Sequence, residues 1–152
     1  MDYQCELQKV APQPAVSIRT WASVQELPKV LGQSFAAVAQ YLAEKGEQPA
    51  GPVFVAYYNM DMQNLDIEAG FPVTRELEGR GAVRPSQIPG GDLASCIFTG
   101  PYAAMVPAYE ALKAWVEDQG REPTGVSYEI YLNDPQTTPP EELQTRILFP
   151  LK

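Results

Sequence analysis

"QYLAEKGEQPAGPVFVAYYN" at residues 40–59 and "AWVEDQGREPTGVSYEIYLN" at residues 114–133 are two copies of one pattern, 74 positions apart. The identical pairs at this shift are Gly46 and Gly120, Pro49 and Pro123, Gly51 and Gly125, Tyr57 and Tyr131, and Asn59 and Asn133. Repetition of this kind indicates that the fold contains the same supersecondary unit twice.

The repeat continues upstream into a predicted helix in each copy. Apolar residues spaced 4, 3 and 4 mark one helical face, and they are Leu31, Phe35, Val38 and Leu42, then Met105, Tyr109, Leu112 and Val116. Gly46 and Gly120 suit the left-handed conformation that commonly follows a helix. Pro28 and Pro101 fit the first turns. Pro107 predicts either a kink in the second helix or a later start.

Each predicted helix lies between strand-like runs. These runs are AVSIRTWA (15–22), PVFVAYYN (52–59) and LDIEAGFPV (65–73), then LASCIFTG (93–100), VSYEIYLND (126–134) and LQTRILFPL (143–151). Two further segments, CELQKV (5–10) and residues 80–92, are expected to add strand pairing where the two repeats are joined. The chain is therefore expected to be a single domain, residues 1–152, with pseudo-repeats at about 1–75 and 80–152.

The expected fold class is α+β, with tandem duplicated strand-helix-strand-strand units. A helix must bury its apolar stripe and a sheet at least one face. The two units should form a joint antiparallel sheet with two helices on one face. The opposite face is expected to curve and to hold a ligand groove between the halves, because junctions between subdomains favour ligand sites.

The composition and charge of the chain argue against two classes of function, nucleic-acid binding and membrane binding. The chain has 152 residues, a net charge of -8 and no basic cluster, so we expect no nucleic-acid binding by this chain alone. No apolar run approaches the roughly 20 residues of a membrane span, and the N-terminus does not resemble a signal peptide. We therefore expect a cytoplasmic protein that does not bind membranes.

The chain has no histidine, which removes the commonest catalytic base and most zinc sites. It also lacks a glycine-rich phosphate loop, and neither a metal nor a cofactor is expected. Cys5 and Cys96 form no CxxC pair and are expected to be buried, reduced thiols.

One carboxylate, Glu129, interrupts the apolar strand YEIYLNDP (128–135), where the other copy has Val55. If its face looks into the groove, which we favour, the carboxylate lies among tyrosines. If it faces the helices, it is a buried charge that needs a partner; if it faces water, it has no special role. Glu68 in LDIEAG is expected to be a solvated strand-face residue.

The segments IPGGDLASCIFTGPY, GREPTGVSYEIYLNDP and TRILFPL, within the duplicated plan, resemble the gyrase-inhibitor-like (GyrI-like) family. These small-molecule-binding domains form the effector-binding parts of bacterial multidrug-responsive and AraC-type transcription regulators, and also occur alone. The resemblance runs from about residue 4 to residue 152. Because no DNA-binding segment precedes residue 4, a stand-alone member is expected.

The resemblance implies a site for lipophilic cations with Glu129 as its glutamate. It also implies aromatic walls, for which the candidates are Tyr131, Tyr57, Phe149, Trp21 and Phe71. Independently, a partly desolvated carboxylate among aromatic rings attracts flat cationic molecules.

Three functions follow in order of preference. The first is binding or sequestration of lipophilic, cationic aromatic molecules. The second is hydrolysis of electrophilic cyclopropane-type toxins, as some stand-alone relatives do, with Glu129 as base and Tyr131 or Tyr57 orienting the water. The third is a protein-interaction module, such as a gyrase-directed inhibitor.

Overall fold

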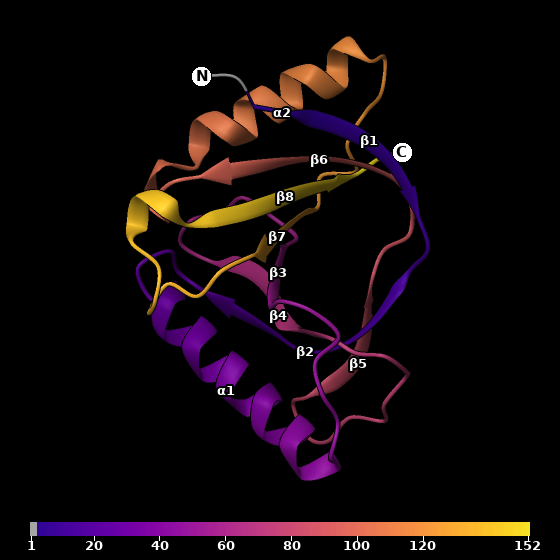
Figure 1. The fold of residues 1–152 in the computed structure, drawn as a ribbon, viewed down its shortest axis with the longest axis vertical. Helices are drawn as coiled ribbons and strands as arrows, with labels where there is room; N and C mark the ends of the chain where they lie inside the picture. The colour runs from indigo at the N-terminus through magenta and orange to yellow at the C-terminus, as the bar shows by residue number, and fades with distance from the viewer. Residues whose placement is uncertain (1–2) are drawn as a thin grey trace. The chain divides into compact units, whose positions relative to one another are not determined.

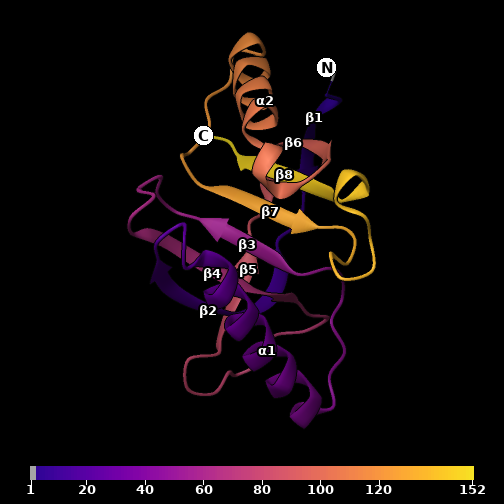
Figure 2. The same ribbon diagram turned by 90° about the vertical axis from the view of Figure 1, so that its left-hand side faces the viewer.

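The structure is a computed structural model that describes residues 3–152. Residues 12–89 form one of its two compact units. The predicted order of strand, helix, strand and strand is observed as β2 (Gln13–Ala22), α1 (Leu27–Lys45), β3 (Phe54–Tyr57) and β4 (Leu65–Pro72), followed by β5 (Arg84–Ile88). The strands pair antiparallel in the order β3-β4-β2-β5. Helix α1 packs along one face of this sheet through Val38 and Leu42, which join Val16 of β2 in the core (Figure 2).

The second unit repeats this plan with residues from both ends of the chain. Its elements are β6 (Gly91–Thr99), α2 (Val106–Asp118), β7 (Ser127–Tyr131) and β8 (Gln144–Pro150), joined by β1 (Cys5–Val10). These strands also pair antiparallel, in the order β1-β6-β8-β7. Helix α2 covers one face of this sheet, where Leu112 and Val116 pack with Cys96 and Ile147 (Figure 1).

The two sequence repeats, 1–75 and 80–152, exchange their edge strands. β1 belongs to the first repeat in sequence but pairs with β6 of the second, and β5 belongs to the second but pairs with β2 of the first. The compact units are therefore residues 12–89 and residues 90–152 with the N-terminal segment, so they differ at their edges from the sequence repeats. The pairing expected from CELQKV and from segment 80–92 is confirmed.

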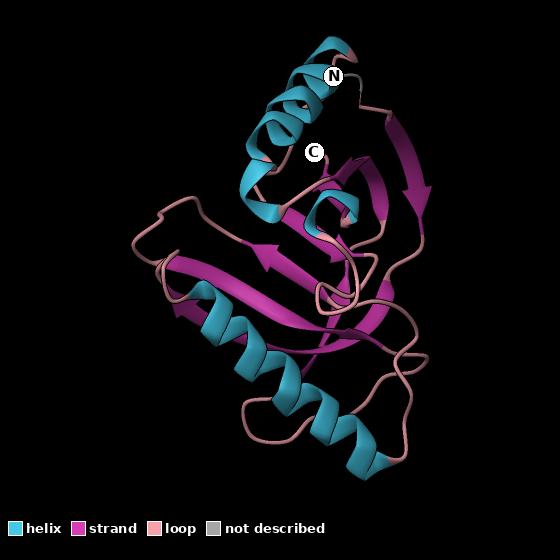
Figure 3. Cartoon of the chain, turned by 60° about the vertical axis from the view of Figure 1, so that its left-hand side comes forward, coloured by secondary structure: helices cyan, strands magenta, loops and turns pink. Residues whose placement is uncertain are grey.

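The helix ends follow the sequence signals. Gly46 and Gly120 adopt left-handed φ values of 68° and 71°, which is where the absence of a side chain matters. A separate 3-10 turn, η1 (Tyr102–Ala104), comes before α2, which has Pro107 in its first turn (Figure 3). Pro107 therefore marks the later start, and the placement of Pro101 in the first turn of α2 is wrong, because Pro101 begins η1.

The α+β class with antiparallel pairing is confirmed in both units. Within residues 3–152, no helix has the length and apolar character needed to cross a membrane.

Candidate functional site

Glu129 lies on the face of its sheet that carries α2. On β7 it is in register with Ile147 of β8, which is in register with Cys96 of β6. Residues directly opposite in antiparallel strands point to the same face, and Ile147 and Cys96 belong to the core beneath α2. The expectation that Glu129 would lie on the face opposite the helices is therefore wrong.

Two tyrosine hydroxyls hold the Glu129 carboxylate. Tyr109 of α2 donates a hydrogen bond to one oxygen, and Tyr131 donates to the other at 2.7 Å. Because each oxygen has a donor, a carboxylate on this covered face is tolerated without a salt bridge. The site thus fixes both the position and the orientation of the carboxylate.

The electrostatics of Glu129 are set by opposing effects. Burial raises the pKa of its carboxyl group, while the hydrogen bonds from Tyr109 and Tyr131 partly oppose this rise. None of the salt bridges found within residues 3–152 involves Glu129. When ionised, its charge is stabilised by hydroxyl dipoles, and its attraction for a cation remains available.

Aromatic rings surround this carboxylate. The Tyr102 ring lies over Tyr131 with centroids 5.2 Å apart, and Tyr109 packs against Phe149 at 5.8 Å. Phe149 is only 7% exposed, whereas Tyr102, on η1, is 39% exposed and forms the outer part of the cluster. The structure therefore brings together Glu129, Tyr131 and Phe149 from the predicted set and adds Tyr102 and Tyr109.

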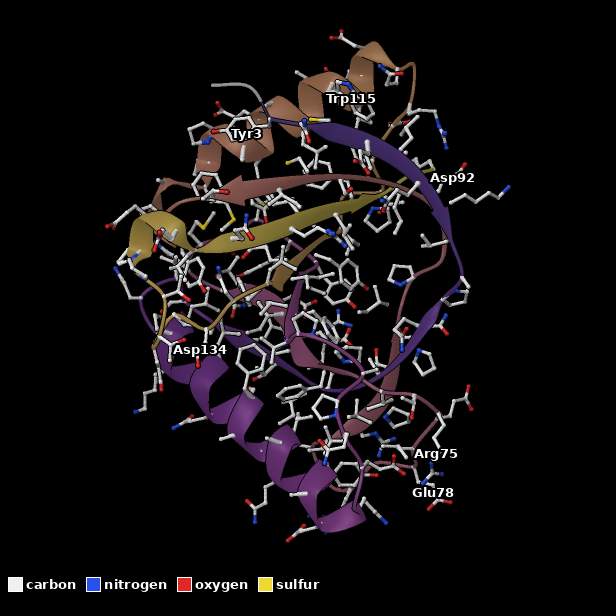
Figure 4. The ribbon with its side chains drawn as sticks, in the orientation of Figure 1. Tyr3, Arg75, Glu78, Asp92, Trp115 and Asp134 are labelled. Atoms are coloured by element: carbon white, nitrogen blue, oxygen red, sulfur yellow. The ribbon has the colours of Figure 1, made fainter. Side chains whose placement is uncertain are left out.

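The Tyr102 hydroxyl is influenced by the same charge. Burial raises its pKa, and the negative charges of Glu129 and Asp134 raise it further. Asp134 lies in the turn that follows β7 (Figure 4). Tyr102 is therefore held in its neutral phenol form beside the carboxylate.

The other three predicted residues belong to the unit 12–89. Tyr57 and Phe71 lie on the face that carries α1, where Phe71 packs edge-on against Phe35 at 6.3 Å. Trp21 is in register with Asp66 on the helix-free face and is 55% exposed. Trp21 and Phe71 therefore point to opposite faces of one sheet.

Glu68 is not the solvated residue that the sequence led us to expect. It is 6% exposed and accepts hydrogen bonds from Ser17 at 2.6 Å, from Tyr58 at 2.5 Å, and from Ser86. Ser17 on β2 and Ser86 on β5 lie on the same helix-free face as Glu68 on β4. The expectation is wrong because hydroxyl donors from neighbouring strands replace water.

Sequence reasoning missed Tyr102 and Tyr109 as site residues. Tyr109 was assigned to the apolar stripe of its helix, but the repeat held a signal. The position 74 residues earlier is Phe35, so the second copy carries an extra hydroxyl as well as an extra carboxylate. Tyr102 is the last residue of the segment IPGGDLASCIFTGPY that carries the family resemblance, but its spacing gave no sign that it lies beside Glu129.

Solved structures share the fold. The C-terminal domain of EcmrR superposes with a TM-score of 0.84 at 24% identity, covering 100% of this chain and 99% of that domain. In a complex of EcmrR with DNA, the matched region is 57% of the EcmrR chain, so this chain spans little more than half of that regulator. A search of curated protein sequences found no significant match.

Two further neighbours differ in their described roles. A hydrolase from Listeria innocua matches with a TM-score of 0.71 at 14% identity, over 98% of this chain and 92% of that one. SAV2435, solved with tetraphenylphosphonium bound, matches with a TM-score of 0.58 at 14% identity, over 100% of this chain and 94% of that one. Residues 3–152 match the sequence profile of the GyrI-like small molecule binding domain. The two duplicated units and this match over nearly the whole length place the chain in the GyrI-like family of small-molecule-binding domains.

Proposed function

We propose that this domain binds lipophilic, cationic aromatic molecules and that Glu129 is the group that recognises their positive charge. The observation that carries the proposal is the Glu129 carboxylate, held by two tyrosine hydroxyls and surrounded by aromatic rings. Tyr57, Phe71 and Trp21 lie in the unit 12–89, with Phe71 and Trp21 on opposite faces of its sheet, so these three stay sequence predictions on which the proposal does not rest.

The chemistry favours cations over neutral molecules. A carboxylate that is partly removed from water gains more from a nearby positive charge than a solvated one does. Tyrosine and phenylalanine faces attract organic cations and stack on flat rings. Such contacts require little directional hydrogen bonding, so the site should accept cations of several shapes. This tolerance supports a role in sequestering diverse compounds.

The comparisons support the same class of ligand. Tetraphenylphosphonium, bound in the SAV2435 structure, is a lipophilic cation with four aromatic rings. It is therefore a suitable first probe for the present domain.

The test is a calorimetric titration of wild-type protein and Glu129→Gln with tetraphenylphosphonium and with neutral triphenylphosphine oxide. Loss of a charge-assisted contact should weaken cation binding by about five-fold to a hundred-fold, or ~1 to 3 kcal/mol, with a far smaller effect on the neutral probe. Glu68→Gln makes the same chemical change in the other unit and should leave both affinities unaltered. Equal losses for the two probes in Glu129→Gln would contradict charge recognition.

A second function is favoured by the same carboxylate. Glu129 carries two hydroxyl partners that could orient a water molecule, and a structural neighbour from Listeria innocua is described as a hydrolase. In the candidate reaction, water attacks a strained, electrophilic ring carbon and Glu129 accepts the proton of the water. A C–O bond forms as a ring C–C bond breaks, and the electron pair of the broken bond passes to the electron-withdrawing group that activates the ring, which is then protonated. A carboxylate is a weak base, so the substrate must already be activated.

A further inference from the structure

The buried carboxylate of Glu68 has no part in the function proposed above. It lies on the helix-free face of the sheet formed by residues 12–89, and Ser17 and Ser86 both donate to one of its oxygens. Tyr58 donates to the other oxygen, and the guanidinium of Arg19 stacks on the Tyr58 ring at 3.7 Å. Three hydroxyl protons are therefore committed to one carboxylate.

The charges on this face do not cancel. Arg19 pairs with both oxygens of Asp66, at 2.6 and 2.7 Å, so its positive charge is already matched. Glu68 forms none of the salt bridges found within residues 3–152. Together, Asp66, Arg19 and Glu68 leave one excess negative charge, which the three hydroxyl donors to Glu68 and the nearby charge of Arg19 stabilise.

Ser86 connects this carboxylate to the surface. Its side chain is half-buried, and it lines an open hollow of about 460 Å³ together with Ala15, Glu76, Pro85 and Gln87. A hydroxyl has one proton, and that of Ser86 points to Glu68, so only its oxygen lone pairs remain for a ligand in the hollow. Glu68 thereby fixes Ser86 as an acceptor.

The other residues that line the hollow add a negative charge and apolar surface. Glu76 is exposed and adds a second acceptor with a negative charge, and exposed Pro85 contributes apolar surface, whereas Ala15 is only 2% exposed. We propose that this hollow is a second small-molecule site, which takes primary ammonium compounds with a short apolar tail. The ammonium group would donate to Ser86 and Glu76, and the tail would lie on Pro85.

The test uses n-butylammonium, with 1-butanol and butanoate as probes of similar length and different charge. Titration of ¹⁵N-labelled protein should shift the amide signals of Ala15, Ser86 and Gln87 with butylammonium, and far less with the other two probes. Glu68→Gln replaces an acceptor by a donor that can turn the Ser86 proton outward. The affinity of Glu68→Gln for butylammonium should fall by about three-fold to ten-fold, which corresponds to the free energy of one lost hydrogen bond.

Two further variants make the result decisive. Ser86→Ala keeps Glu68 and should weaken butylammonium to a similar extent, which also covers the case in which Glu68→Gln fails to fold. Glu129→Gln should have no effect. Any of four results would overturn the proposal: butylammonium leaves the Ser86 and Gln87 signals unmoved, folded Glu68→Gln binds it as tightly as wild type, Ser86→Ala binds it as tightly as wild type, or its binding depends on Glu129. None of these results would affect the function proposed for Glu129.

Discussion

Tyr109 donates a hydrogen bond to Glu129 at positions where the other repeat has Phe35 and Val55. Around these positions, Phe35 packs against Phe71 in one unit and Tyr109 packs against Phe149 in the other. One unit thus has two apolar residues at these positions, and the other has a hydrogen-bonded tyrosine and glutamate. The Tyr109 hydroxyl and the Glu129 carboxylate therefore form one hydrogen-bonded pair between α2 and β7.

This relationship predicts strong coupling between the two residues. Tyr109→Phe should destabilise the protein by about 1 to 3 kcal/mol, because one Glu129 oxygen loses its donor on a covered face. Adding Glu129→Val recreates the Phe and Val pair of the other unit and should recover much of the loss. Urea denaturation of both single variants and the double variant gives the coupling energy. Additive effects would show that the two side chains act independently.

The elements of the fold could be predicted because their signals are local and occur twice. Helical spacing from Leu31 to Leu42, and the matching stripe from Met105, need only neighbouring residues. The exchange of β1 and β5 could not be predicted, since strand pairing between distant segments leaves no periodic trace. Pro107 was correctly recognised as a possible start, but the separate turn η1 was not expected.

The site could be predicted only in part. Strand alternation groups Glu129 with Tyr131, but alternation alone does not say which face carries the helix. The register of Glu129 with Ile147 decides this. The prediction that Glu68 is solvated failed for a related reason. Its hydrogen-bond donors Ser17 and Ser86 come from strands that are distant in sequence, so they lie beside it only in the folded sheet.

Thr145 tests the energetic cost of an unsatisfied hydroxyl next to the site. It is fully buried, is in register with Tyr131, and its Oγ1 has no hydrogen-bond partner within residues 3–152. Thr145→Val keeps the shape and removes the hydroxyl, so it should stabilise the protein by about 1 kcal/mol. Urea denaturation measures the change, with exposed Thr99→Val as the control. A clear loss of stability would mean that the hydroxyl is satisfied in solution.

The two cysteines should differ in reactivity. Cys5 and Cys96 are cross-strand partners, and burial raises the pKa of both thiols, that of Cys96 to about 12. At pH 8, about one Cys96 thiol in ten thousand would then be ionised. Dithionitrobenzoate should label half-buried Cys5 first and Cys96 only on unfolding. Cys5→Ser and Cys96→Ser variants identify the signals, and rapid labelling of Cys96 in folded protein would contradict the prediction.

The hydrolase alternative makes a separate prediction. If Glu129 acts as a base, the protein should open the ring of a cyclopropane-containing alkylating agent without added metal, as followed by mass spectrometry. Glu129→Gln should abolish turnover while retaining the fold, because an amide cannot accept the proton. Glu68→Gln should remain active. Metal-dependent turnover, or an active Glu129→Gln variant, would exclude Glu129 as the base.

The raised pKa of Glu129 predicts how stability and cation binding depend on pH. The unfolded chain has an ordinary glutamate pKa of about 4.3, so the folded state holds its proton more tightly. The contribution of Glu129 to stability should therefore fall as pH rises from the ordinary value through the raised one. Glu129→Gln should lack this fall when the two proteins are compared by denaturation across that range.

Cation affinity should change with pH in the opposite direction to that stability contribution. A cation binds the ionised carboxylate better, so binding below the raised pKa must displace a proton. Affinity for tetraphenylphosphonium should therefore rise with pH through this window and become constant once Glu129 is ionised in the free protein. Calorimetry in two buffers of different ionisation enthalpy would detect the released proton. A wild-type profile as flat as that of Glu129→Gln would show that the cation does not bind beside this carboxylate.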